Sequence, residues 1–227
     1  MVRLIIICAA GWLLAAQPAD LEKARDRQDR VALQKLAAEL RAEADRHPND
    51  ARAQFQHALA ESYVAEVAME LKDRNQARAA AEAGIASAQK AVALEPRNAE
   101  YHRVLGTLCG QILPANPLLG IRYGKCAQES VNKAVELDPK LPTAYLARGI
   151  GNYYLPPSFG GGVELAIRDF ERAIQLNPKL ADAWLWLGIA QRKAGRNAEA
   201  RKSLQRVVEL NPNRIWAKLQ LEKTPAK

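Results

Sequence analysis

The sequence is poor in the residue types that most often mark a metal site or a redox centre. It has only three cysteines and three histidines in 227 residues. The histidines, His47, His57 and His102, are isolated and form no i, i+4 pair, and the cysteines match no zinc or C-x-x-C spacing. We therefore expect no metal site and no cofactor.

Motifs for catalysis and phosphate binding are also missing. No G-x-S-x-G occurs, and the glycine run at 160–162 is not followed by the Gly-Lys-Ser/Thr of a phosphate-binding loop. This run could still hold an anion at the N-terminus of the next helix, but a flexible inserted turn is the simpler interpretation. The sequence therefore favours a protein that is not an enzyme.

Long runs of like charge are absent too. The formal net charge is +8 and the isoelectric point is about 9.5, yet Lys and Arg are interspersed with Asp and Glu and no five like charges follow one another. Without a basic stripe, we interpret these charges as a solvated surface and expect no nucleic-acid partner.

What the sequence does contain is a strong helical pattern, clearest between Pro178 and Pro212. Apolar residues from Leu180 to Ala194 recur at steps of three and four, which is the pattern of one helix face. Gly195 ends this helix, and a second helix begins at Asn197 and stops before the proline. A single hairpin of this kind cannot bury its own apolar face, so we expect neighbours.

The same 35 residues carry a family signature. It consists of Trp184, Leu187, Gly188, Ala200, Leu204 and Pro212, with a period of 34 residues between the prolines. In spacing and period the segment resembles a tetratricopeptide repeat, a helix–turn–helix unit, with Gln191 where the family usually has Tyr. The resemblance implies an all-α fold, a right-handed superhelical solenoid of such hairpins.

Regularly placed prolines extend the repeat over most of the chain. Pro48, Pro96, Pro139, Pro178 and Pro212 each follow a helix end, at intervals of 48, 43, 39 and 34 residues. We predict about four units, with extra residues inserted between the two helices at 113–120 and 155–162. Both inserted turns are expected on one edge of the solenoid, where they could pack on each other.

The N-terminus has the parts of a secretory signal peptide. Arg3 precedes an apolar run of 13 residues, Leu4–Ala16, and small residues follow. An uncleaved short anchor is the alternative, and it would be the protein's only link to a membrane. A narrower resemblance, A-N-P-x-x-G…G-K followed by P-P-x-F-G-G, is to exported bacterial tetratricopeptide proteins, which implies the periplasm or secretion.

These patterns divide the chain into four parts. We expect a signal peptide at 1–19, N-terminal helices forming a degenerate repeat or cap at 20–47, the solenoid at 48–212, and a C-terminal capping helix and tail at 213–227.

The pairing of Cys109 and Cys126 stays open. They lie on the two helices of the second unit, where an exported protein could form a disulfide. Pairing Gly106 with Ala127 across the hairpin, however, places Gly124 opposite Cys109, about half a turn from the second cysteine. Two buried thiols are the alternative.

The resemblance also implies where a partner would bind, because the first helix of each repeat lines the concave groove in this family. The matching positions are Phe55, Leu59, Arg103, Thr107, Leu146, Ile150, Tyr153, Tyr154, Leu185, Ile189 and Arg192. The Lys/Asn/Arg clamp of chaperone-binding members is not reproduced. Alternatively, these side chains pack on one another or on the N-terminal helices.

We therefore predict a non-catalytic scaffold that binds an unidentified protein partner through a peptide or helix in this groove. A lipid or small-molecule carrier is the alternative, and it would require an enclosed apolar cavity larger than roughly 300 Å³.

Overall fold

The computed structural model describes residues 18–113 and 120–226, and within them every regular element is helical. The helices are α1 (Pro18–Asp26), α2 (Arg30–Arg46), α3 (Ala51–Glu70), α4 (Arg74–Leu94), α5 (Ala99–Ile112), α6 (Gly120–Leu137), α7 (Pro142–Tyr154), α8 (Val163–Leu176), α9 (Ala181–Lys193), α10 (Asn197–Leu210) and α11 (Ile215–Glu222), with a 3₁₀ turn, η3 (Pro157–Phe159). The predicted all-α solenoid of helix–turn–helix repeats is confirmed.

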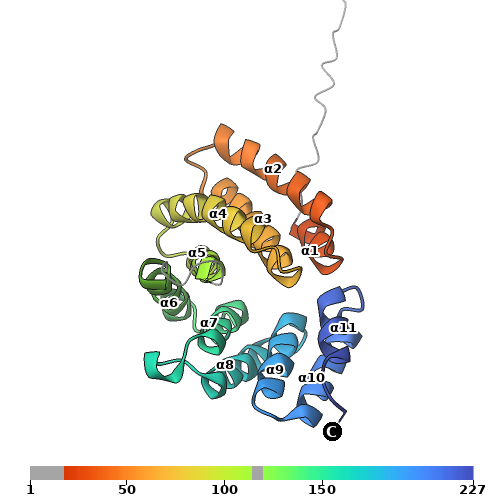
Figure 1. The fold of residues 1–227 in the computed structure, drawn as a ribbon. Coiled ribbons are helices and arrows are strands. Elements are labelled where there is room, and N and C mark those ends of the chain that lie inside the picture. Colours follow the sequence, from red (N-terminus) through yellow and green to blue (C-terminus); the bar gives the residue numbers. More distant parts are fainter. Residues whose placement is uncertain (1–17, 114–119, 227) are drawn as a thin grey trace, which may run out of the picture.

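Consecutive helices pack as antiparallel hairpins, α3 with α4, α5 with α6, α7 with α8 and α9 with α10. Each hairpin also packs on the next, so the stack curves as it proceeds. Figure 1 shows that this curve returns on itself, with α11 close to α1. The molecule is therefore a single turn of solenoid whose two ends lie close to each other.

The prolines between repeats work together with the residue before them. Asp138, Asn177 and Asn211 each accept a hydrogen bond from the backbone N–H two residues later, at 2.9, 3.0 and 3.2 Å. Because a residue that precedes proline disfavours the helical conformation, the helix ends there and the side chain closes a tight turn. The Asp-Pro or Asn-Pro pair thus determines where the chain reverses direction between two repeats.

A second contact recurs six residues after three of these prolines. His102, Tyr145 and Trp184 donate to the carbonyl oxygens of Pro96, Pro139 and Pro178, at 2.9, 3.2 and 3.0 Å. The large side chain at this position therefore ties the first helix of a repeat to the turn before it. This explains both the Trp of the signature and the isolated histidine of the second unit.

Glycines permit the two helices of a hairpin to approach closely. A Cβ on Gly149 would lie 2.5 Å from a ring carbon of Phe170, and one on Gly188 would lie 2.6 Å from Leu204 Cγ. Such contacts are shorter than packed carbon atoms allow. The Leu-Gly pair of the signature is thus a packing requirement.

The inserted turn at 155–162 is held by hydrogen bonds and differs from the flexible turn expected. The N–H of Gly162 donates to Asn152 O at 2.8 Å, and Gly160 takes a φ of 83°, which favours glycine. Phe159 in this turn is 72% exposed. The predicted partner turn falls largely at 114–119, outside the described residues, as does most of the predicted signal peptide, residues 1–17.

Cys109 and Cys126 form a disulfide between α5 and α6, with their Cα atoms 6.0 Å apart. The alternative of two free thiols is therefore wrong. The register predicted from the sequence is displaced, because Gly106 lies between Ala127 and Val131, and a Cβ on Gly106 would lie 2.7 Å from Val131 Cγ1. That displacement along α6 brings the second cysteine opposite the first.

No described helix combines the length and the apolar character that crossing a membrane requires.

Replacing Gly188 with leucine should lower the free energy of unfolding by about 1–3 kcal/mol, since the added side chain overpacks the contact with Leu204. Urea denaturation measures this change. Gly124→Leu is the matched control, because a Cβ at Gly124 meets nothing within 4 Å. Equal stabilities of the two variants would contradict the assigned packing.

Reducing the disulfide should cost about 3 kcal/mol of stability, since it closes a loop with a sequence separation of 17. Urea denaturation with and without a reductant measures the loss. A Cys109→Ser/Cys126→Ser double variant should start from the lower stability and show no response to the reductant. A wild-type protein that is equally stable in both conditions would argue against the bridge.

Candidate protein-binding surface

Three residues predicted to line the groove are buried in the core instead. Leu59, Leu185 and Ile189 are 9%, 0% and 5% exposed. The last two pack against α10 and against Ala217 of α11, which covers the first helix of the preceding repeat. These three side chains are therefore unavailable to a partner. They pack inside the protein, as the alternative interpretation predicted.

The three polar residues of the predicted groove have partners within the chain. Arg103 Nε donates to Glu100 at 2.5 Å, and the Thr107 hydroxyl donates to the backbone oxygen of Arg103 at 3.0 Å. Arg192 Nη2 donates to the side chain of Gln220 at 2.6 Å. Arg192 thus fastens the capping helix α11.

The remaining predicted residues are partly buried or exposed apolar side chains. Phe55 stacks on Tyr101 with ring centroids 4.8 Å apart. Leu146 and Ile150 are partly buried against the core of α8 and α9. Tyr154 is 56% exposed at the end of α7.

Aromatic rings from three helices form a continuous row, which we call the aromatic ladder: Tyr153, Tyr154, Trp186 and Trp216. Trp186 lies 5.7 Å from Tyr153, 6.1 Å from Tyr154 and 5.5 Å from Trp216, centroid to centroid, in edge-to-face geometry. Lys193 Nζ lies 4.1 Å from the centre of the Tyr153 ring. Sequence reasoning missed the two tryptophans, because neither stands at a family groove position.

A group of charged side chains connects the start of the solenoid to its end. It comprises two residues of α1, two of α3, one of α9 and one of the turn before α11, and we call it the closure cluster: Arg25, Asp26, Glu66, Glu70, Asp182 and Arg214. It lies where Figure 1 shows α1 and the end of α3 facing the C-terminal helices.

Arg214 is the central member and its side chain is 0% exposed. Its Nη2 lies 2.6 Å from Glu66 Oε1 and 2.5 Å from Glu70 Oε1. Its Nε finds no hydrogen-bond acceptor among the described residues, although Asp182 Oδ1 lies 3.5 Å away. The loop between α10 and α11 is thereby fixed to α3, about 144 positions earlier in the chain.

Arg25 makes the second connection, from α1 to α9. Its Nη1 donates to Asp182 Oδ2 at 2.8 Å and its Nη2 donates to Asp26 Oδ1 at 2.8 Å. The guanidinium carbon lies 4.9 Å from the centre of the Tyr63 ring. Asn211 adds a bond from its amide to Asp26 Oδ2 at 2.7 Å. Both guanidiniums therefore bridge the two ends.

Burial and charge act in opposite directions on the carboxyls of the cluster. Burial outweighs the nearby Arg214 and raises the pKa of Glu70 to about 7. It also raises the pKa of Glu66. At Asp182 burial is outweighed by Arg25 and Arg214, which lower the pKa of that carboxyl. The cluster therefore combines two carboxyls whose pKa is raised by burial with one, Asp182, whose pKa is lowered by the two guanidiniums.

The seam closed by this cluster is polar. One cluster of buried apolar side chains lies within α1–α6, and two others lie within α7–α11. Among the described residues, no apolar cluster contains side chains from both the first and the last helices of the solenoid. The ends of the solenoid are consequently joined by ionic groups and hydrogen bonds instead of a shared apolar core.

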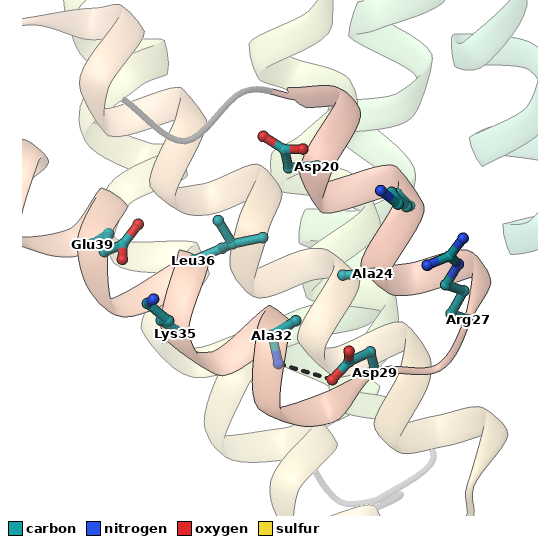
Figure 2. Close-up of a pocket in the computed structure, with 9 residues that line it drawn as sticks. Asp20, Ala24, Arg27, Asp29, Ala32, Lys35, Leu36 and Glu39 are labelled. Atoms are coloured by element: carbon teal, nitrogen blue, oxygen red, sulfur yellow. Dashed lines mark hydrogen bonds between the residues drawn. The ribbon is translucent and has the colours of Figure 1, made fainter. Parts of the chain in front are cut away.

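A cleft of about 320 Å³ lies between α1 and α2, and Figure 2 shows the side chains that line it. Charged groups of both signs predominate, and the apolar contribution is Ala24, Ala32 and Leu36. The Asp29 side chain accepts a hydrogen bond from the N–H of Ala32 at 3.0 Å and thereby caps the N-terminus of α2. This cleft is open to solvent and carries charges of both signs, so it is not the enclosed apolar cavity that a lipid carrier needs.

Family comparisons cover most of the chain. The family model described as "Regulator of microtubule dynamics protein 1-3" matches residues 15–155, and a tetratricopeptide repeat model matches residues 160–215. The resemblance to tetratricopeptide repeat proteins is thus confirmed. No curated protein matches the chain.

Several solved structures are similar to this chain in fold. TTC0263, a thermophilic tetratricopeptide protein of Thermus thermophilus, aligns with a TM-score of 0.64 at 16% identity, covering 88% of this chain and 97% of its own. The HusA haemophore of Porphyromonas gingivalis aligns with a TM-score of 0.53 at 20% identity, covering 87% and 96%. At these identities the likeness concerns the fold alone.

Proposed function

Because this chain belongs to the family described as "Regulator of microtubule dynamics protein 1-3" and folds as tetratricopeptide repeats, we propose that it is a scaffold that binds another protein. Repeats of this type commonly act as non-catalytic interaction modules, and their stacked hairpins present extended surfaces. The family description names the regulation of microtubule dynamics, and we do not extend that role to this chain. The partner of this chain is an unidentified protein.

The aromatic ladder is the observation that carries this proposal. Its rings come from α7, α9 and α11, and Tyr154 remains 56% exposed although it is a large side chain at a helix end. Tyrosine and tryptophan are enriched among the residues that contribute most to protein interfaces, because they bury much area at little cost in conformational entropy. Leu146, Ile150 and the ladder are the proposed binding surface for a peptide or helix.

Export to the periplasm or cell envelope of a bacterium is part of the proposal. The signal-like composition of residues 1–19 supports it, and so does the disulfide, since disulfides persist mainly in oxidising compartments. The division of the chain into residues 20–47, 48–212 and 213–227 is also part of this proposal. A non-catalytic role is also part of the proposal, and it is supported by the side chains of Arg103, Thr107 and Arg192, which form hydrogen bonds within the chain.

The proposal is tested by affinity capture from the native host, with the tagged full chain as bait. Tyr154→Ser should reduce the recovery of a specific partner at least tenfold relative to wild type, which corresponds to about 1.4 kcal/mol or more of binding free energy. Quantitative mass spectrometry of the captured proteins measures the ratio.

Leu94→Ser is the matched control, because Leu94 is 42% exposed at the end of α4, away from the ladder. It should retain the partner. A partner lost equally with both variants would argue against the ladder as the binding surface. Recovery of a lipid or small molecule in place of a protein would replace the scaffold with the carrier alternative.

A further inference from the structure

The positive charge of this chain is concentrated at the C-terminal end of the solenoid. Residues 191–227 contain ten lysines or arginines and only three carboxylic side chains, so they carry seven of the eight net positive charges of the chain. They include the end of α9 and all of α10 and α11, and α10 packs against both of its neighbours (Figure 1). Residues 1–190 are close to neutral.

Most of these C-terminal charges are not neutralised within the protein. Three of the cations pair with carboxylates: Arg196, Arg206 and Arg214. Six others form no ion pair with a described carboxylate, and we call them the basic cap: Arg192, Lys193, Arg201, Lys202, Lys218 and Lys223. Only two carboxylates of this segment, Glu199 and Glu222, also lie outside the described ion pairs. The basic cap therefore keeps an excess of positive charge.

The basic cap adjoins the aromatic ladder. Lys193 Nζ lies 4.1 Å from the centre of the Tyr153 ring and donates to the backbone oxygen of the same residue at 3.1 Å. Arg192 and Arg201 both donate to Thr224, at 3.1 and 2.8 Å. This threonine follows α11, the helix that carries the last ring of the ladder. Aromatic rings and unpaired cations thus come from the same helices and touch one another.

We propose that the partner of this protein is an acidic protein segment, which places carboxylates against the basic cap and apolar side chains on the aromatic ladder. The proposal rests on the proposed function, because it names the chemistry of the segment that the scaffold binds. Buried aromatic side chains supply affinity at such a surface, and complementary charge selects and orients the partner.

The arrangement of the rings favours a protein over a nucleic acid, which is another common polyanion. Bases bind to aromatic side chains by stacking on free ring faces. In the ladder the Trp186 ring meets three other rings edge to face, and Lys193 covers a face of Tyr153. The exposed part of the ladder, such as Tyr154 at 56%, suits the irregular apolar side chains of a polypeptide.

The proposal is tested by fluorescence anisotropy of labelled peptides titrated with the full chain in 50 mM NaCl. The probe is an amphipathic helical peptide of glutamate, leucine and tryptophan, and two matched peptides carry glutamine or lysine in place of every glutamate. The acidic peptide should bind at least about tenfold more tightly than the glutamine peptide, and the lysine peptide should bind most weakly. In 1 M NaCl the advantage of the acidic peptide should disappear, because salt screens exposed charges.

A pair of charge variants locates the effect. Lys193→Gln/Lys218→Gln should reduce the preference for the acidic over the glutamine peptide by about fivefold, since exposed ion pairs each contribute a modest amount. Lys35→Gln/Lys90→Gln is the matched control, because it removes the same charge from exposed positions on α2 and α4. This control should keep the preference of wild type.

Equal affinities for the three peptides would overturn the acidic preference and leave the scaffold function in place. The same conclusion follows if no peptide binds while affinity capture still recovers a partner that depends on Tyr154. If the capture recovers no such partner either, the proposed function itself fails. Single-stranded DNA or phosphatidylglycerol vesicles that bind more tightly than the acidic peptide would replace the protein segment with a nucleic acid or a lipid surface.

Discussion

A buried guanidinium determines the shape of this molecule. Arg214 is 0% exposed, and its bonds to Glu66 and Glu70 hold the last helix of the solenoid against the third one. A stack of helical hairpins has no intrinsic reason to end where it began, since each repeat contacts only its neighbours. Removing a partner from a buried ionic group leaves charges that are costly to desolvate, so the joined form depends on the whole set.

The repeats themselves are specified locally. Each turn is set by an Asp or Asn before proline, and the first helix is tied to the turn by a side chain six residues later, as with Trp184 and Pro178. Glycines such as Gly188 let the second helix approach. These constraints act over short stretches of chain, which is why the hairpins form reliably while the relation between the two ends rests on side chains far apart in sequence.

This difference in range also decides what the sequence predicts. Helix periodicity and proline spacing predict the hairpins well, including the capping helix that begins near Ile215. The closure cluster escapes prediction, because Arg25 and Asp182 are 157 positions apart and look like ordinary charges on helix surfaces. The interpretation of all charges as solvated is therefore wrong for Arg25 and Arg214. The prediction that Leu185 and Ile189 line the groove is wrong, because the capping helix covers both side chains.

The most direct measurement of the central claim is small-angle X-ray scattering of wild type and Arg214→Met at pH 6. Methionine is a long, uncharged side chain that cannot neutralise the carboxylates of the closure cluster. The account predicts that wild type scatters as the joined solenoid in Figure 1, and that the variant keeps its helix content but has a larger radius of gyration. Equal radii for the two proteins would contradict the claim that Arg214 holds the ends together.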